Sequence, residues 1–296
     1  TEETNIGLSA YMFNNRLSLE ADYFVKNTDN LVIPVLPLVG TEISLQNVGA
    51  VRNKGIELAA TWRGTISENW GYSISGNFST IDNEITDLEG QPYINRGTAE
   101  ARQRLVVGQP INVFYGYQID GVYQNDAEIA NDPVAQAAIN EGINVEPGYF
   151  RYRDLNNDGV LDADDRSYLG SPVPTHYYGG SLGINYKNLE LNVSFYGQGG
   201  NKILNTNRME VIRTQGRNID AELAINRWHG EGTTNEFPSS QGYRNLWNQR
   251  LSKFFLQDGD FFRIQNIQLA YTLKEDKLPE MRFTLTADRP FLWTKS

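Results

Sequence analysis

The sequence predicts an all-β protein built on an antiparallel sheet, and two observations support that prediction. The stretch from Tyr178 to Gly197 alternates apolar and polar residues along two arms, the period-two pattern of strands with one apolar face. Lys187-Asn188 between the arms leaves room only for a tight turn, so the arms pair as a hairpin. The composition agrees, because the 296 residues include 16 Tyr, 13 Phe and 27 Gly, which favours sheet over helix.

Three further pairs of alternating segments flank this hairpin. The expected strands, in order, are 6–13, 16–25, 53–62, 70–78, 178–186, 189–195, 266–273 and 282–287. Within each pair the connection is short, as at Asn14-Asn15. Residues 26–51 are expected to be a long connection, because Pro34 and Pro37 interrupt strand pairing.

Two longer excursions follow, 83–175 and 198–260. In the first, Pro110 to Tyr123 is aromatic enough to extend, and Ala127 to Ile139 has helical composition interrupted by Pro133. Short turns that alternate with long loops are typical of outer-membrane barrels, whereas sandwiches distribute loop length more evenly. The fold class expected is therefore an antiparallel transmembrane β-barrel with long extracellular loops.

Charged side chains of the expected strands fall on the polar face, where a barrel lumen tolerates them: Glu20, Asp22, Glu57, Glu190 and Arg282. Arg263 is the exception, because it is in phase with the apolar Ile267. We expect it either to lie above the lipid band or to be turned by a β-bulge.

Composition excludes several classes of protein. A formal net charge of -10 argues against nucleic acid as a partner, and no run of about 18 apolar residues could form a membrane helix. The chain has two His, no Cys and neither G-x-S-x-G nor H-E-x-x-H, so an enzyme is not expected. No signal peptide opens the sequence and an apolar pattern closes it, which predicts an internal piece of a longer protein.

Four stretches occur in the order in which one family has them. They are Asn47 to Glu57, Gly116 to Gln124, Pro147 to Arg166, and Phe262 to Leu273, and the third, with Tyr152-Arg153-Asp154-Leu155-Asn156-Asn157-Asp158-Gly159-Val160-Leu161-Asp162, is the most specific. Together they resemble the SusC/RagA family of TonB-dependent outer-membrane transporters over essentially the whole chain. Tyr149 stands where that family commonly has Asp.

The resemblance implies that residues 1–296 are the C-terminal portion of a plugged barrel of about 22 strands, of which these eight are roughly the fourteenth to the twenty-first. The plug and the last strand would lie outside this chain. The resemblance further implies outer-membrane import of oligosaccharides or peptides, energised by TonB through the missing N-terminal part, with a SusD-like surface lipoprotein as lid. Where the family reads Q-N-L-F this chain has Asp288-Arg289-Pro290-Phe291, and Pro290 is expected to end the last strand early.

A possible calcium loop lies in the most specific motif. Its candidate ligands occupy positions 1, 3, 5, 7, 9 and 12 of an EF-hand-like spacing with glycine at position 6: Asp154, Asn156, Asp158, Val160 through its carbonyl, Asp162 and Asp165. Four carboxylates around Gly159 repel one another without a cation, so structural Ca²⁺ is expected. The other interpretation is a solvated turn, since Asp and Asn favour turns unaided.

Aromatic residues of the long loops are candidates for contact with substrate or lid: Tyr115, Tyr117, Tyr123, Trp228, Tyr243 and Trp247. The alternative is that they form the loops' own small core. The alternative for the whole chain is a soluble or surface-displayed β-sandwich that binds glycans and carries a calcium loop. Such a sandwich would need a second sheet against its apolar face.

Overall fold

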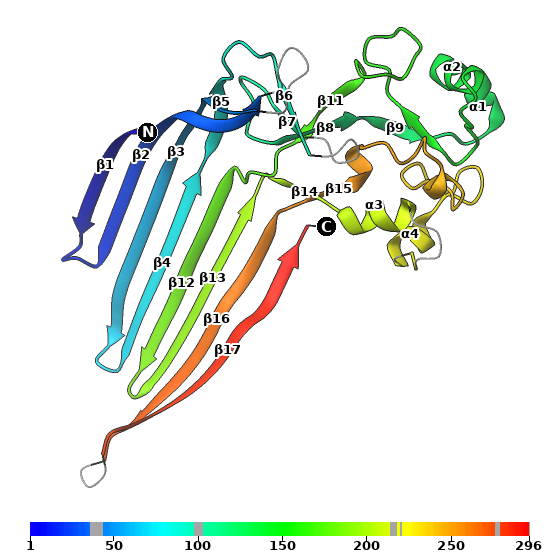
Figure 1. Ribbon diagram of the computed structural model, residues 1–296. Helices are drawn as coiled ribbons and strands as arrows, with labels where there is room; N and C mark the ends of the chain where they lie inside the picture. The colour runs from blue at the N-terminus through cyan, green and yellow to red at the C-terminus, as the bar shows by residue number, and fades with distance from the viewer. Residues whose placement is uncertain (36–43, 98–102, 214–217, 220, 276–278, 296) are drawn as a thin grey trace.

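The computed structural model describes residues 1–35, 44–97, 103–213, 218–219, 221–275 and 279–295. One large antiparallel sheet dominates it (Figure 1), with strand order β1-β2-β3-β4-β12-β13-β16-β17 and β5 beside β3. The strands are β1 (Glu2–Met12), β2 (Leu17–Val35), β3 (Ser44–Ser67), β4 (Trp70–Thr80), β5 (Asp82–Asp87), β12 (His176–Tyr186), β13 (Leu189–Gly199), β16 (Phe261–Leu273) and β17 (Met281–Thr294). All eight predicted strands are present in the predicted pairs.

Tight turns join the strands at one end of the sheet. Asn14 and Asn15 adopt φ of 57° and 63°, the left-handed region that asparagine tolerates better than most residues. Lys187 adopts φ of 52° in the turn between β12 and β13. These connections bring each strand directly back beside its predecessor and fix the hairpin register.

The prediction that residues 26–51 form a connection was wrong. β2 continues to Val35 and β3 begins at Ser44, and the two pair along this stretch, with Pro34 opposite Leu45. Proline removes only one hydrogen-bond donor from the ladder, and the flanking residues continue the pairing, with Val32 opposite Asn47 and Val35 opposite Ser44. Pro37 lies outside the described residues.

A bulge shapes β16 and β17. Gln265 has no cross-strand partner on β13, because the residues on either side of it pair with consecutive residues of that strand. Ile264 pairs with Phe195 and Asn266 pairs with Ser194. Because of this extra residue, the side chains before and after Gln265 alternate in opposite phase. A β-bulge of this kind was one of the two expectations for Arg263. The prediction that Pro290 ends the last strand was wrong, since β17 passes through a matching irregularity at Pro290 and reaches Thr294.

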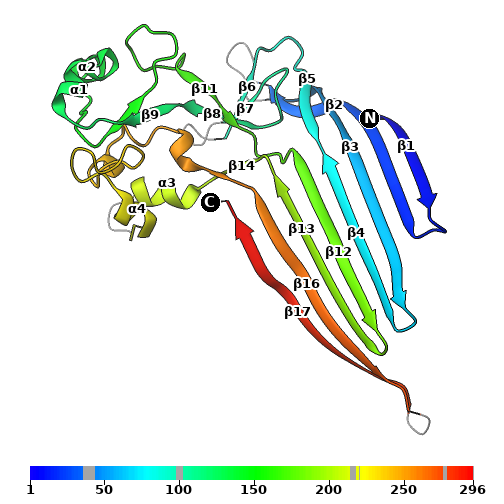
Figure 2. The ribbon, with the colours of Figure 1, turned by 180° about the vertical axis from the view of Figure 1, so that it is seen from behind.

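The remaining elements gather at the end of the sheet opposite the tight turns (Figures 1 and 2). We call residues 88–175 and 200–260 the loop module. Its elements are β6 (Ile94–Arg96), β7 (Gln103–Leu105), β8 (Val113–Tyr117), β9 (Ile119–Val122), α1 (Asp126–Ala130), α2 (Pro133–Asn140), β10 (Phe150–Tyr152), β11 (Arg166–Gly170), β14 (Lys202–Leu204), α3 (Thr206–Arg213), α4 (Ala221–Asn226), two short 3₁₀ helices (Gly242–Arg244 and Lys253–Phe255) and β15 (Leu256–Asp258). Among the described residues no helix is both long and apolar enough to cross a membrane.

Pro133 separates two short helices in the segment where helix was expected. Asn125 caps α1 by accepting the Glu128 N–H at 3.0 Å, and Asp132 caps α2 by accepting the Val134 N–H at 2.9 Å. Proline suits the first position of a helix, where its missing N–H is not needed. The interruption read from the sequence is therefore confirmed as a helix start.

The two long loops share one hydrophobic core. Tyr123 and Phe150 from the first loop pack in one buried cluster with Trp247 from the second. The Trp247 indole N–H donates to the Phe150 carbonyl at 2.7 Å, and the Phe150 N–H donates to the Asn248 side chain at 2.6 Å. The loop module is therefore a folded body, held by buried and satisfied polar groups.

Candidate functional site

The apolar face of the large sheet is uncovered. Leu182, Val193 and Ile267 meet side by side across β12, β13 and β16, and Ile74 of β4 is opposite Leu182 and 51% exposed. Within the described part of the chain no second sheet covers this face, as the sandwich alternative would require. A continuous apolar surface of this kind is typical of a sheet that faces lipid.

Aromatic side chains form two rows on that face. Near the loop module the Tyr178 ring lies 6.4 Å from Phe262, which lies 5.5 Å from Trp293. Near the tight turns Trp70 and Tyr186 are 4.4 Å apart. Measured along a strand, the two rows are about 26 Å apart. In a barrel whose strands tilt by about 40°, this corresponds to about 20 Å along the membrane normal. That spacing fits aromatic girdles on either side of an apolar band.

The opposite face of the sheet carries polar side chains, many of them small. Ser75 and Ser181 share a hydrogen bond of 2.7 Å across β4 and β12, and Arg282 forms an ion pair of 2.6 Å with Glu190. Arg263 lies on this face too, where it donates to the Tyr196 hydroxyl at 3.1 Å. A wall with one apolar and one polar face can separate lipid from a water-filled lumen.

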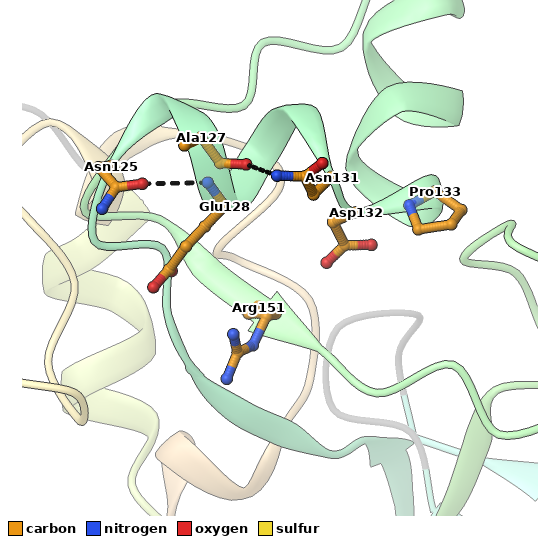
Figure 3. Close-up of a pocket in the computed structure, with 7 residues that line it drawn as sticks. All are labelled: Asn125, Ala127, Glu128, Asn131, Asp132, Pro133 and Arg151. Atoms are coloured by element: carbon orange, nitrogen blue, oxygen red, sulfur yellow. Dashed lines mark hydrogen bonds between the residues drawn. The ribbon is translucent and has the colours of Figure 1, made fainter.

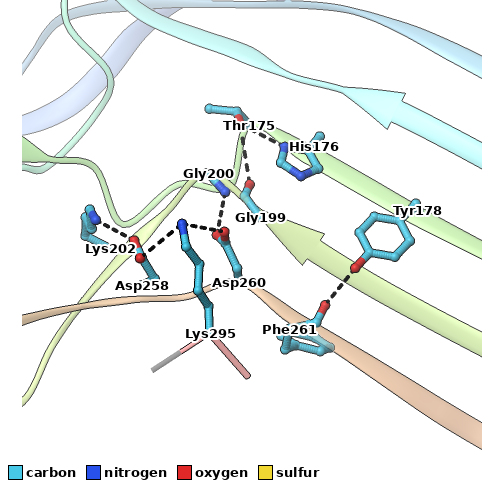
Figure 4. A network of polar contacts seen from close by, with 10 residues as sticks. All are labelled: Thr175, His176, Tyr178, Gly199, Gly200, Lys202, Asp258, Asp260, Phe261 and Lys295. Carbon is cyan, nitrogen blue, oxygen red and sulfur yellow. Dashed lines mark hydrogen bonds and ion pairs between the residues drawn. The ribbon is translucent and has the colours of Figure 1, made fainter. Parts of the chain in front are cut away.

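A polar network fastens the loop module to the end of the sheet (Figure 4). Asp258 accepts hydrogen bonds from Lys202 and Lys295, the latter at 3.3 Å, and Asp260 accepts the Gly200 N–H at 2.8 Å. The hydrogen bond from Lys202 lowers the pKa of Asp258 below its usual range. The sequence analysis did not identify this network, although Asp258-Gly259-Asp260, with an aspartate on each side of a glycine, indicates a polar turn.

Four of the six predicted contact residues lie in the core of the loop module. Tyr117, Tyr123, Tyr243 and Trp247 are between 0% and 6% exposed. Burial, followed by the hydrogen bond to Asp132, raises the pKa of the Tyr123 phenol. These four side chains hold the loops together, and a contact of theirs with ligand or lid stays a prediction.

Tyr115 and Trp228 keep part of their surface accessible. The Arg104 guanidinium lies 3.5 Å from the centre of the Tyr115 ring, and Tyr168 packs on the same ring at 5.6 Å. The Trp228 indole N–H donates to the Gln124 carbonyl oxygen at 3.2 Å. Of the six, these two are the residues placed to reach a molecule outside the loop module.

The candidate calcium loop is closed by its own carboxylates. Asp154 accepts the Gly159 N–H at 2.8 Å, and glycine adopts φ of 81° there. The Asp165 carboxylate is fully buried and accepts the N–H groups of Leu155 and Asp162, both at 2.8 Å. Among the described residues no three His, Cys, Asp or Glu side chains converge on one point as a metal site requires. Calcium binding therefore stays a prediction.

A sheet that is apolar outside, polar inside and capped at one end by a folded loop module defines the wall of a transmembrane β-barrel. A sequence profile described as TonB dependent receptor-like, beta-barrel matches residues 1–288. The chain belongs to this family of TonB-dependent receptor β-barrels.

Relatives and solved structures agree with this assignment. The chain is 29% identical over 284 residues to TonB-dependent receptor P26 of Formosa agariphila, covering 94% of this chain and 28% of that protein. It is 23% identical over 287 residues to TonB-dependent receptor SusC of Bacteroides thetaiotaomicron, covering 93% and 26%. A structure of the RagAB peptide transporter superposes with a TM-score of 0.76 at 23% identity, covering 99% of this chain and 32% of that chain. The chain thus spans about a quarter to a third of these proteins' lengths.

Proposed function

We propose that this chain forms part of the wall and the outer loops of a TonB-dependent importer in the outer membrane. The observation that carries the proposal is the two-faced sheet, apolar between two aromatic rows and polar on its other side. Membership of the TonB-dependent receptor family supports it. The tight turns would lie in the periplasm, and the loop module would lie outside the cell.

The substrate class that we propose is an oligosaccharide or peptide, captured together with a SusD-like surface lipoprotein acting as a lid. The relatives named SusC and RagAB support this choice. The lumen face offers serine, asparagine and glutamate side chains along which a polar ligand could pass. Tyr115 and Trp228 are the two predicted aromatics that we assign to ligand or lid contact, because they keep exposed surface.

We also propose that the loop from Asp154 to Asp165 binds Ca²⁺ and is ordered by it. The ligand spacing and the turn at Gly159 support the proposal. The residues that would hold the ion are Asp154, Asn156, Asp158, the Val160 carbonyl, Asp162 and Asp165. They would have to converge further than they do in the arrangement described above, and aspartate at the last position is shorter than the usual glutamate.

The test of import starts from the full-length protein in its own membranes. It is extracted in mild detergent with calcium present, and the proteins and small molecules that copurify are identified by mass spectrometry. A lipoprotein in equal amount and a bound glycan or peptide are the expected result. Recovery in the aqueous fraction without detergent contradicts the proposal, as does undiminished uptake of the copurified ligand in cells without TonB.

A further inference from the structure

A small sheet in the loop module has one face packed on a core and one face open. Its strand order is β11-β8-β7-β6, and Ile94 and Leu105 on the first face are buried in one cluster with Val51 of the large sheet. On the second face Tyr93, just before β6, and Tyr168 of β11 are 43% and 42% exposed. Within the described residues this second face is therefore accessible to another molecule.

Arg104 of β7 lies between two tyrosine rings on that face. Its guanidinium carbon is 3.9 Å from the centre of the Tyr93 ring and 3.5 Å from the centre of the Tyr115 ring. Only its Nε–H is used within the described residues, in a hydrogen bond of 2.9 Å to the Asn95 side chain. Ring stacking occupies the faces of the guanidinium and leaves the N–H groups at its edges free, so Arg104 keeps its charge and most of its donors for a partner.

Two further arginines lie one step along β8. Tyr117 follows Tyr115 on the same face of that strand, about 7 Å away. The guanidinium carbons of Arg166 and Arg250 are 5.2 and 5.7 Å from the centre of its ring. Arg166 donates its Nε–H to the Tyr117 hydroxyl at 3.0 Å, and neither arginine forms an ion pair within the described residues. We call Arg104, Arg166 and Arg250, with the tyrosines Tyr115 and Tyr117 beneath them, the arginine stripe.

Two other arginines of the loop module lie beside carboxylates. The buried Arg208 forms an ion pair of 2.5 Å with Glu222, and Arg151 shares a cavity with Glu128 and Asp132 (Figure 3). The arginine stripe has no such carboxylate among the described residues, although the chain has 36 acidic residues and a net charge of -10. Partly buried cations that the protein itself leaves unpaired favour an acidic partner.

We propose that the arginine stripe binds an extended acidic segment of a partner protein, with carboxylates on alternate residues. Side chains of alternate residues in an extended chain project to the same side about 7 Å apart, which is the separation of Tyr115 and Tyr117 and so of the arginines stacked on them. A carboxylate accepts two parallel hydrogen bonds from a guanidinium. Tyrosine and arginine are also enriched among the residues that dominate binding between proteins.

The shape of this surface favours a protein segment over a small ligand. Small ligands favour enclosed cavities, whereas a row of side chains across a sheet matches an extended chain. The inference extends the contact role that the import proposal gives to Tyr115, and it rests on that proposal only for the side of the membrane on which the stripe lies. Binding in detergent tests the inference alone, whereas uptake in cells with and without TonB tests import.

The first experiment measures binding to the full-length protein in detergent by fluorescence anisotropy. The probes are labelled octapeptides: one alternates glutamate and serine, one has the same residues with all glutamates in one block, and one alternates lysine and serine. Arg104→Gln and Arg166→Gln each remove one charge from the stripe. Arg96→Gln is the matched control, because this exposed arginine follows Asn95 on β6 and therefore points to the opposite face of the sheet.

An acidic segment has a distinct signature in these measurements. We expect the alternating acidic peptide to bind more tightly than the block peptide, with an affinity that falls as salt is added. Each stripe variant should weaken binding by about tenfold or more and reduce its dependence on salt, because hydrogen bonds to a charged group are lost, while Arg96→Gln leaves both unchanged. A loss that is equal at every salt concentration would indicate a disturbed sheet and contradict the proposal. Equal affinity for the block or the lysine peptide, or no binding of the alternating acidic peptide, also overturns it.

The second experiment identifies the occupant by photocrosslinking of the full-length protein in its own membranes. p-Benzoylphenylalanine in place of the exposed Tyr168 puts a photoreactive ring beside Tyr115 on the same face of the sheet. The expected product joins this position to a segment of a second protein in which aspartate or glutamate recurs at alternate residues. A crosslink only to a small ligand or to another part of this same polypeptide refutes the proposal, as does the absence of any crosslink.

Discussion

Adjacent residues at the centre of β13 allow a direct test of which face meets lipid. Val193 is on the apolar face, midway between the two aromatic rows that reach β13 opposite Tyr178 and Tyr186, about 13 Å along the strand from each. Its neighbour Asn192 points to the polar face at nearly the same depth. Arginine on the lipid face near the midplane costs about 2–4 kcal/mol, so Val193→Arg should lower the free energy of unfolding by that amount. Asn192→Arg should change it by less than about 0.5 kcal/mol.

The assay is equilibrium unfolding of the full-length protein from lipid vesicles, with the amount of folded variant in outer membranes as a second measurement. The two variants introduce the same side chain one residue apart, so differences in expression or net charge cancel. Equal losses at the two positions, or a greater loss at Asn192, would show that the sheet does not separate lipid from a lumen. The assignment of its faces would then be refuted.

Three further predictions concern the loop module. Tyr123→Phe removes a buried hydroxyl that donates to Asp132, so hydrogen exchange of α2 should show a loss of about 1–3 kcal/mol, and unchanged protection would contradict this role. Asp258 has a lowered pKa through Lys202, so its contribution to stability is complete above the ordinary value of 3.8 and is lost as pH falls through the lower folded value. The melting temperature of Asp258→Asn should therefore fall below wild type at pH 7 and approach it in stronger acid, whereas a constant difference would exclude this linkage. Calcium should raise the melting temperature of the wild-type protein but not that of Asp154→Asn, which removes the aspartate that the motif requires at its first position, and an equal rise in both would remove the proposed ion from this loop.

The strands of the barrel wall could be predicted from the sequence because each has one apolar and one polar face. The alternation around Leu182 and Leu191 specifies both the strand and the face that it turns outward. The expectation that Pro34 interrupts pairing was wrong, since one missing N–H does not end a ladder that the flanking residues continue. The bulge at Gln265 was inferable only through the misplaced charge of Arg263.

The loop module was less predictable because its residues are fixed by contacts between distant segments. Trp247 looks like a ligand-contact residue in a polar loop, yet it is buried against the first long loop, which the sequence cannot place beside it. Tyr243 is buried against distant residues of its own loop, Met209 and Leu223 among them.

β4 and β12 are neighbours in the sheet, although residues 81–175 intervene along the chain. Closing a flexible loop costs free energy that grows only with the logarithm of its length, so halving or doubling this segment changes the cost by about 0.6 kcal/mol. Because the inserted segment folds on its own core together with the second loop, the barrel wall can accept a very different insertion at the same rim at little cost. With the loop module outside the cell, as proposed above, selection can exchange what the cell surface presents while the membrane-facing strands stay as they are.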